Sequence, residues 1–113
     1  MSIQRYVTEM GMGVDVHGGD YTKAARRAVA DAIRHSSLNF FSVLDKKPQD
    51  MRITVRLGAQ EPAQIDCTAV AAELPYGEVT VEALPGGLDV PSDNGRDLMV
   101  IVNAAILVGF EEA

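Results

Sequence analysis

The last long apolar segment of the chain, Leu98–Glu111, limits the possible folds more than any other segment. It is apolar at both odd and even positions and is interrupted by Asn103. A strand of this kind is buried on both faces, which is typical of the centre of a sheet with two covered faces. The apolar run is too short to form a membrane-spanning helix. We therefore predict a central strand and expect each face of its sheet to be covered.

Periodicity predicts the remaining elements. Apolar residues alternate with polar ones in strands and recur at helical spacing in helices. The further predicted strands are Ile3–Met12, Met51–Leu57, Glu78–Leu84 and a short extra strand at Leu88–Val90. The predicted helices are Tyr21–Ser36, which has an alanine-rich apolar face and Asp20 as its N-cap, and the shorter Asp66–Leu74.

The order of these elements is β-α-β-α-β-β, which predicts an α/β (α+β) two-layer sandwich with both helices on one face of a mixed four- to five-stranded sheet. A chain of 113 residues is long enough for one core, so residues 1–113 are predicted to be a single domain. The other face of the sheet is then most easily covered by another subunit. We expect a homo-oligomer, with a homotrimer as the first choice.

Composition excludes several classes of partner. The net charge of −6 argues against binding to nucleic acid or to an anionic membrane, because phosphate binding needs a basic face. A single cysteine, Cys67, rules out an internal disulfide and fits a reducing compartment. The first residues lack the pattern of a signal peptide. We therefore expect a soluble cytoplasmic protein.

The segment EMGMGVDVHGG, near the N-terminus, carries the strongest candidate site. In an extended chain Glu9, Gly11, Gly13, Asp15 and His17 share one face. The two glycines are expected to leave open space in front of the carboxylate and the imidazole. Zinc and similar divalent ions accept this mixture of ligands. We predict Asp15, His17 and Glu9 as catalytic residues, with Gly11 and Gly13 as ligand-binding residues.

The chemistry of this segment has three possible forms. His35 projects toward the sheet from the end of the predicted helix, so Asp15, His17 and His35 can form a three-ligand metal site with one position open for water. Alternatively, Asp15 and His17 act as acid–base groups without a metal. In the third form Asp15 caps backbone amides and the segment is only a tight turn.

Other residues complete the list of candidates. Gly18 precedes a helix start whose free amides can hold an anion, although Asp20 as the cap opposes this. Arg52 and Arg56 share one strand face and are candidates for binding a carboxylate or phosphate, with a solvated face as the alternative. Asn103 is expected to be a buried polar residue in the apolar strand, and such a residue needs a hydrogen-bond partner.

The segment GMGVDVHG, followed by a basic, alanine-rich helix, resembles a family of conserved hypothetical proteins from bacteria and plants. The signature G-x-G-x-D-x-H-G of that family falls on Gly11, Gly13, Asp15, His17 and Gly18. The resemblance extends over nearly the whole chain, including IRHSSL, LPYG and GGLD. It implies that these five residues are important and names no reaction.

Two further resemblances point to chemistry. The segment is similar to the start of methylerythritol cyclodiphosphate synthase, which implies zinc binding by Asp15 and His17 at a subunit boundary. The size and element order are similar to trimeric chorismate mutase, to enamine/imine deaminases and to single domains of ring-opening amidohydrolases. Those folds imply ligand sites between subunits or domains.

The sequence therefore predicts a small oligomeric protein with a small-molecule site, which a divalent metal such as zinc can complete, at the subunit interface. Hydrolysis or lyase-type chemistry on a small polar metabolite is the expected reaction. The alternative is a non-catalytic ligand-binding protein or structural oligomer. The sequence alone does not decide whether the protein is an enzyme.

Overall fold

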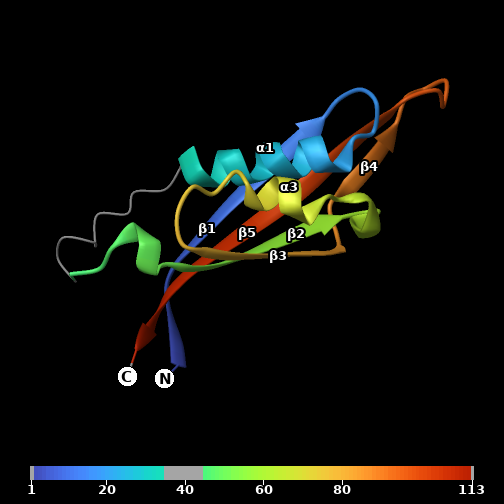
Figure 1. Ribbon diagram of the computed structural model, residues 1–113. Coiled ribbons are helices and arrows are strands. Elements are labelled where there is room, and N and C mark those ends of the chain that lie inside the picture. The colour runs from blue at the N-terminus through green and yellow to red at the C-terminus, as the bar shows by residue number, and fades with distance from the viewer. Residues whose placement is uncertain (1, 35–44, 113) are drawn as a thin grey trace.

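The computed structural model describes residues 2–34 and 45–112, and it confirms the predicted two-layer α/β sandwich (Figure 1). The strands are β1 (Ser2–Asp15), β2 (Arg52–Ala59), β3 (Glu78–Pro85), β4 (Leu88–Pro91) and β5 (Leu98–Glu112). The helices are α1 (Tyr21–Arg34) and α3 (Cys67–Ala71), with 3₁₀ turns at Pro48–Asp50 and Pro62–Gln64. None of the helices in these ranges is long and apolar enough to cross a membrane.

Strand β5 lies at the centre of a mixed five-stranded sheet, as its apolar sequence predicts. The strand order is β1-β5-β2-β3, and β4 pairs with the start of β5. β5 is antiparallel to β1 from Ser2↔Glu112 to Asp15↔Val100, and it is also antiparallel to β2 and β4. β2 and β3 are parallel, because the short helix α3 connects them across the sheet. β1 and β2 pair with β5 although they lie far from it in the sequence, whereas β4 reaches β5 through the short loop Ser92–Asp97.

Two predicted elements change most, and both for physical reasons. β1 continues to Asp15 rather than ending at Met12, because its pairing with β5 persists as far as Val100. The second helix is confined to Cys67–Ala71 rather than Asp66–Leu74. Asp66 is its N-cap, with its side chain accepting from the Ala69 N–H, and the chain leaves the helix before Pro75. Proline disfavours helical geometry in the residue before it.

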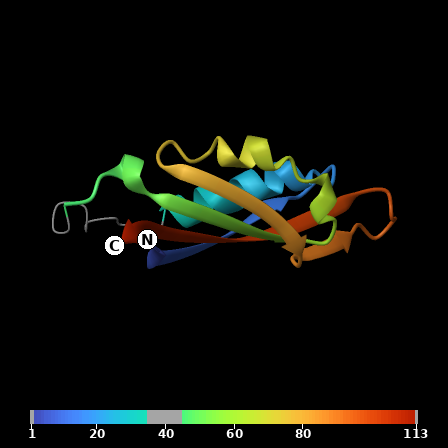
Figure 2. The same ribbon diagram turned by 60° about the horizontal axis from the view of Figure 1, so that its bottom comes forward.

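Both helices cover the same face of the sheet, as Figure 2 shows. The core lies between the layers, where the alanine face of α1 meets alternate residues of the central strands. The fully buried members from β2 and β5 include Val55, Leu57, Val100, Val102 and Phe110. Alternation then places the other residues of these strands on the opposite face.

That opposite face, called the open face below, carries large apolar side chains exposed to solvent. Met10, Met12, Leu88 and Val90 lie on it, and Met10 is 71% exposed. In the part of the chain that the structure describes, no element packs on this face (Figure 2). The prediction that a second subunit covers it concerns an assembly and stays a prediction.

Candidate functional site

The N-terminal motif forms a tight connection from β1 to α1. Gly18 and Gly19 have φ values of +96° and +63°, a conformation that glycine adopts without steric cost. The Asp15 side chain closes the connection, because its Oδ2 accepts a hydrogen bond from the Asp20 N–H at 2.9 Å. Asp20 caps α1 by accepting from the Lys23 N–H at 3.0 Å. The turn geometry predicted as one alternative is therefore present.

Asp15 is a buried carboxylate with several partners. It is 3% exposed, and its Oδ1 lies 3.6 Å from Lys23 Nζ and 3.8 Å from Arg27 Nη1. Two cations and one amide thus surround the two oxygens, which meets the need of a buried charge for partners. A divalent metal ion would have to compete with both cations at this carboxylate. These contacts fit an anchoring role for Asp15 better than a role as a metal ligand.

Gly11 and Gly13 pack against the backbone of α1. A Cβ at Gly11 would lie 2.3 Å from the Ala28 carbonyl oxygen, and one at Gly13 would lie 2.0 Å from the Ala24 carbonyl oxygen. The expectation that these glycines leave open space for a ligand is wrong, because α1 fills that space. Their function in the fold is to let helix and strand approach closely.

His17 lies outside the core and faces a residue that the sequence interpretation missed. Its side chain is 84% exposed, and its Nδ1 is 2.7 Å from Asp97 Oδ2. The other oxygen of Asp97 accepts hydrogen bonds from the Gly18 N–H at 2.9 Å and the Leu98 N–H at 2.8 Å. The segment thus brings His17 together with Asp97, while Asp15 is directed into the protein.

These donors hold the pKa of the Asp97 carboxyl at about 2, with the Gly18 N–H contributing most, followed by His17 and the Leu98 N–H. Asp97 is therefore ionised at neutral pH and acts only as an acceptor. A neutral His17 consequently carries its proton on Nδ1. Its Nε2 then keeps a free lone pair, which is the state of a general base.

The loop Ser92–Asp97 positions this carboxylate. Ser92 Oγ accepts a hydrogen bond from the Asp97 N–H at 3.1 Å, and Asn94 Oδ1 accepts from the Arg96 N–H at 2.9 Å. Side chains of Ser and Asn commonly hold turns in this way. The sequence PSDNGRD shows a loop and its turn residues, but nothing in it shows which distant strand the loop will meet. The pairing of β1 with β5 supplies that information.

A polar hollow of about 610 Å³, called the motif pocket below, adjoins this pair of residues. It is lined by Gly18, Gly19, Tyr21, Glu61, Gln64, Pro91, Gly95, Arg96, Asp97 and Leu98. Within the described ranges the guanidinium of Arg96 has no ion pair. Burial, followed by a hydrogen bond to Asp89, raises the pKa of Tyr21 to about 12, so its phenol stays protonated. The pocket therefore presents the Arg96 guanidinium, the neutral phenol of Tyr21 and the carboxylates of Glu61 and Asp97, and His17 lies beside it as the partner of Asp97.

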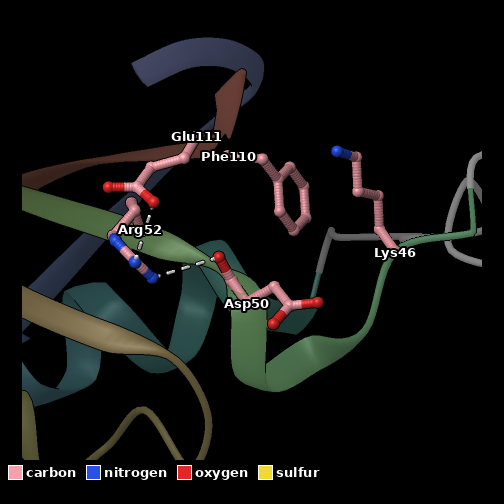
Figure 3. A pocket seen from close by; sticks show the side chains of 5 residues that line it. All are labelled: Lys46, Asp50, Arg52, Phe110 and Glu111. Carbon is pink, nitrogen blue, oxygen red and sulfur yellow. Dashed lines mark hydrogen bonds and ion pairs between the residues drawn. The ribbon is translucent and has the colours of Figure 1, made fainter. Parts of the chain in front are cut away.

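The predicted ligand-binding arginines lie elsewhere. Figure 3 shows Arg52 in a second hollow, of about 220 Å³, with Lys46, Asp50, Phe110 and Glu111. Arg52 contacts Glu78 at 3.0 Å and Glu111 at 3.7 Å, and it donates to the carbonyl oxygen of Asp50. Lys46 pairs with Glu112 at 3.2 Å. Both cations are thus neutralised by carboxylates of the protein.

The other predicted site residues are also apart from His17. Arg56 pairs with Glu82 on the open face. Glu9 lines an apolar pocket of about 180 Å³ near the end of α1. Glu9 precedes Asp15 by six positions in one strand, a separation of roughly 20 Å. His35 lies outside the described residues, and no group of three potential metal ligands occurs within residues 2–34 and 45–112. The three-ligand metal site is one of the alternatives that the sequence predicts, and the cations beside Asp15 argue against it.

Comparison of the sequence with known protein families gives a match over most of the chain. A sequence profile described as conserved hypothetical protein, the Lin0512 family, matches residues 5–108. The chain belongs to the Lin0512 family. This confirms the expected relation to a family of conserved hypothetical proteins. The likenesses to chorismate mutase, to the deaminases and to the cyclodiphosphate synthase stay predictions.

One solved structure has the same fold along its whole length. It is described as an FtsZ-like protein of unknown function from Nostoc punctiforme, and it is 36% identical to this chain with a TM-score of 0.89. The match covers 99% of both chains, so this Lin0512 family chain and its relative share a complete architecture. A search of curated protein sequences gave no match.

Proposed function

We propose that this protein binds a small, negatively charged polar metabolite in the motif pocket and that His17 acts on it as an acid–base group. The hydrogen bond between His17 Nδ1 and Asp97 Oδ2, at 2.7 Å, carries this proposal. It fixes one imidazole nitrogen and leaves the other available at an exposed position next to the pocket. An oriented imidazole of this kind is the usual group for proton transfer near neutral pH.

The proton would move as follows. Nε2 of His17 accepts a proton from a water molecule or from an acidic position of the ligand. Asp97 keeps the Nδ1–H in place and stabilises the imidazolium that forms. Return of the proton to a leaving group completes a hydrolysis or a lyase-type elimination. General acid–base catalysis of this kind contributes roughly 10²–10⁴-fold in rate.

The proposed negative charge of the ligand rests on Arg96, since Asp97 is already held by its own donors and Glu61 is the other carboxylate that lines the pocket. A guanidinium binds carboxylates and phosphates through paired donors, and in the described ranges no carboxylate of the protein neutralises this one. The amides of Gly18 and Leu98 are already used by Asp97, so they are not free for an anion. Arg96 is therefore the group expected to select the ligand. Asp15, Lys23 and Arg27 act at a distance by holding the turn.

The rival function is non-catalytic binding at the same pocket, and the turn geometry of Gly18, Gly19 and Asp15 agrees with it. Both functions need Arg96 for binding. Only the catalytic one needs His17 for turnover. A His17→Gln variant, in which the side chain stays polar but cannot transfer a proton at neutral pH, therefore separates them.

The test is a titration of ¹⁵N-labelled protein with inorganic phosphate, citrate and malonate, followed by amide chemical shifts. The proposal predicts shifts at Gly18, Gly19 and Leu98 and their loss in Arg96→Gln. The matched control Arg34→Gln removes a charge from the exposed end of α1 and should leave binding unchanged. Absence of binding by all three probes, or shifts located away from the motif pocket, would refute the proposed pocket.

Turnover is tested with phosphate and carboxylate esters of p-nitrophenol in the same three proteins and in His17→Gln. We expect His17→Gln to lower kcat at least 100-fold with little change in KM, and Arg96→Gln mainly to raise KM. Equal rates in wild type and His17→Gln would leave binding as the function.

A further inference from the structure

We infer that the open face of the sheet is an interface between copies of this chain. The inference does not depend on the proposed function. It starts from six apolar side chains on the open face, which come from β1, β4, β5 and the end of β3. These are Met10, Met12, Leu84, Leu88, Val90 and Ile101. Apolar patches of this kind on one face mark interaction sites.

The outline of the molecule is larger than the area that a stable interface needs. The molecule measures 56 × 24 × 18 Å along its principal axes, and the sheet runs along the longest of them (Figure 2). A stable interface needs about 800 Å² from each partner. This is roughly 60% of a 56 × 24 Å rectangle. An interface of this size would thus occupy roughly 60% of the outline that the molecule presents on its open side.

The charges on the open face favour a copy of the same chain over a charged partner. The chain has a net charge of −6, but the register places three arginines and three glutamates on this face. They are Arg5, Arg52, Arg56, Glu78, Glu82 and Glu111. Ion pairs already join Arg52 to Glu78 and Glu111, and Arg56 to Glu82. Because the face has no net charge, two copies can approach there without the repulsion that their net charges would otherwise cause.

The exposed edge of the sheet at β1 is protected against addition of another strand. Arg27 Nη1 donates to the Val14 carbonyl oxygen at 2.7 Å, and the Met12 N–H donates to Asp31 Oδ2 at 3.0 Å. Side chains of α1 thus occupy backbone groups that an added strand would need. Self-association is therefore expected through the face and not by extension of the sheet at this part of β1.

Asn103 gives the interface a defined centre. It lies on the open face, opposite Met12 on one side and Gly58 on the other, and it is exposed. Its side chain has no hydrogen-bond partner among residues 2–34 and 45–112. A polar amide within an apolar interface finds a partner across the symmetry axis and fixes how the copies are aligned. The expectation that Asn103 is buried within the chain is wrong, because alternation places it on the open face, and it would be buried only by a second copy.

The test is sedimentation velocity over a concentration series for wild type, Asn103→Asp and the control Asn94→Asp. Both variants add one negative charge to an exposed asparagine without changing its shape, and Asn94 lies in the loop beyond the sheet. We expect wild type and Asn94→Asp to be dimers or trimers, and Asn103→Asp to weaken assembly at least 10-fold. Circular dichroism should show the same fold in all three proteins.

Either of two results would overturn the inference. One is a wild type that stays monomeric up to about 100 μM. Its dissociation constant would then be higher than that of specific interfaces of this size. The other is an assembly that neither Asn103→Asp nor Leu88→Gln weakens, because both residues lie on the open face. The symmetry of the wild-type assembly would show whether two faces meet directly or three surround an axis.

Discussion

Substitution of Gly13 by alanine should strongly destabilise the protein. The added Cβ would lie 2.0 Å from the Ala24 carbonyl oxygen and 2.3 Å from the Ala28 N. Ordinary contact begins at 3.4 Å, so α1 must withdraw by about 1.4 Å or the strand must bend. Overpacking of this kind costs about 1–3 kcal/mol. The upper value applies here because both clashing atoms belong to the helix backbone and cannot rotate away.

A loss of about 3 kcal/mol corresponds to a fall in Tm of roughly 10–20 °C for a domain of this size. Urea unfolding followed by far-ultraviolet circular dichroism measures the free energy directly. The matched control is Gly58→Ala in β2, whose Cβ would meet its nearest atom at 3.4 Å and should change stability by less than about 0.5 kcal/mol. If Gly13→Ala matched that control, the glycine would not be needed for close packing, and open space for a ligand would again be the better interpretation.

Three further predictions concern the ionisable side chains in and beside the N-terminal motif. Because the pKa of Asp97 is about 2 in the folded protein and about 3.9 in an unfolded chain, its contribution to stability is present above about pH 4 and lost toward pH 2. The urea midpoint should therefore decrease less between pH 4 and pH 2 in Asp97→Asn than in wild type. The pKa of Tyr21 is raised to about 12, so its contribution is present below about pH 10 and lost as the pH rises through 12. The free energy of unfolding should decrease less between pH 10 and pH 12 in Tyr21→Phe than in wild type. An equal decrease in both proteins would contradict the role of the buried phenol. Mass spectrometry of tag-free protein should find no stoichiometric divalent metal in wild type or His17→Ala, because Asp15 already has Lys23 and Arg27 beside it. Zinc that is bound by wild type and lost in the variant would restore the metal site.

The fold could be predicted from the sequence because its strongest patterns act locally. The two-sided apolar pattern of Leu98–Glu111 is sufficient to place it at the centre of the sheet. Alanine at helical spacing is sufficient to identify α1 and its buried face. The extent of β1 and the length of α3 depend on pairing and capping partners, so their predicted boundaries shift by a few residues.

The site could be predicted only in part, for a geometrical reason. The motif contains His17, but its partner Asp97 lies 80 positions away in the chain. The sequence around Asp97 predicts a turn and gives no sign of a contact with His17. Alternation places Asp15 and the glycines on one face correctly, and this is the face that α1 covers. A pattern in one strand shows which residues share a face. It does not show whether a helix or a ligand occupies the space in front of them.

The tautomer of His17 tests the central claim most directly. Long-range ¹H–¹⁵N NMR of the imidazole, assigned with the His17→Gln variant, distinguishes protonated Nδ1 from protonated Nε2. The account predicts that neutral His17 in wild type carries its proton on Nδ1, beside the ionised Asp97, and that Asp97→Asn loses this preference. Protonation at Nε2 in wild type, or the same tautomer mixture in both proteins, would contradict the oriented acid–base pair and the function built on it.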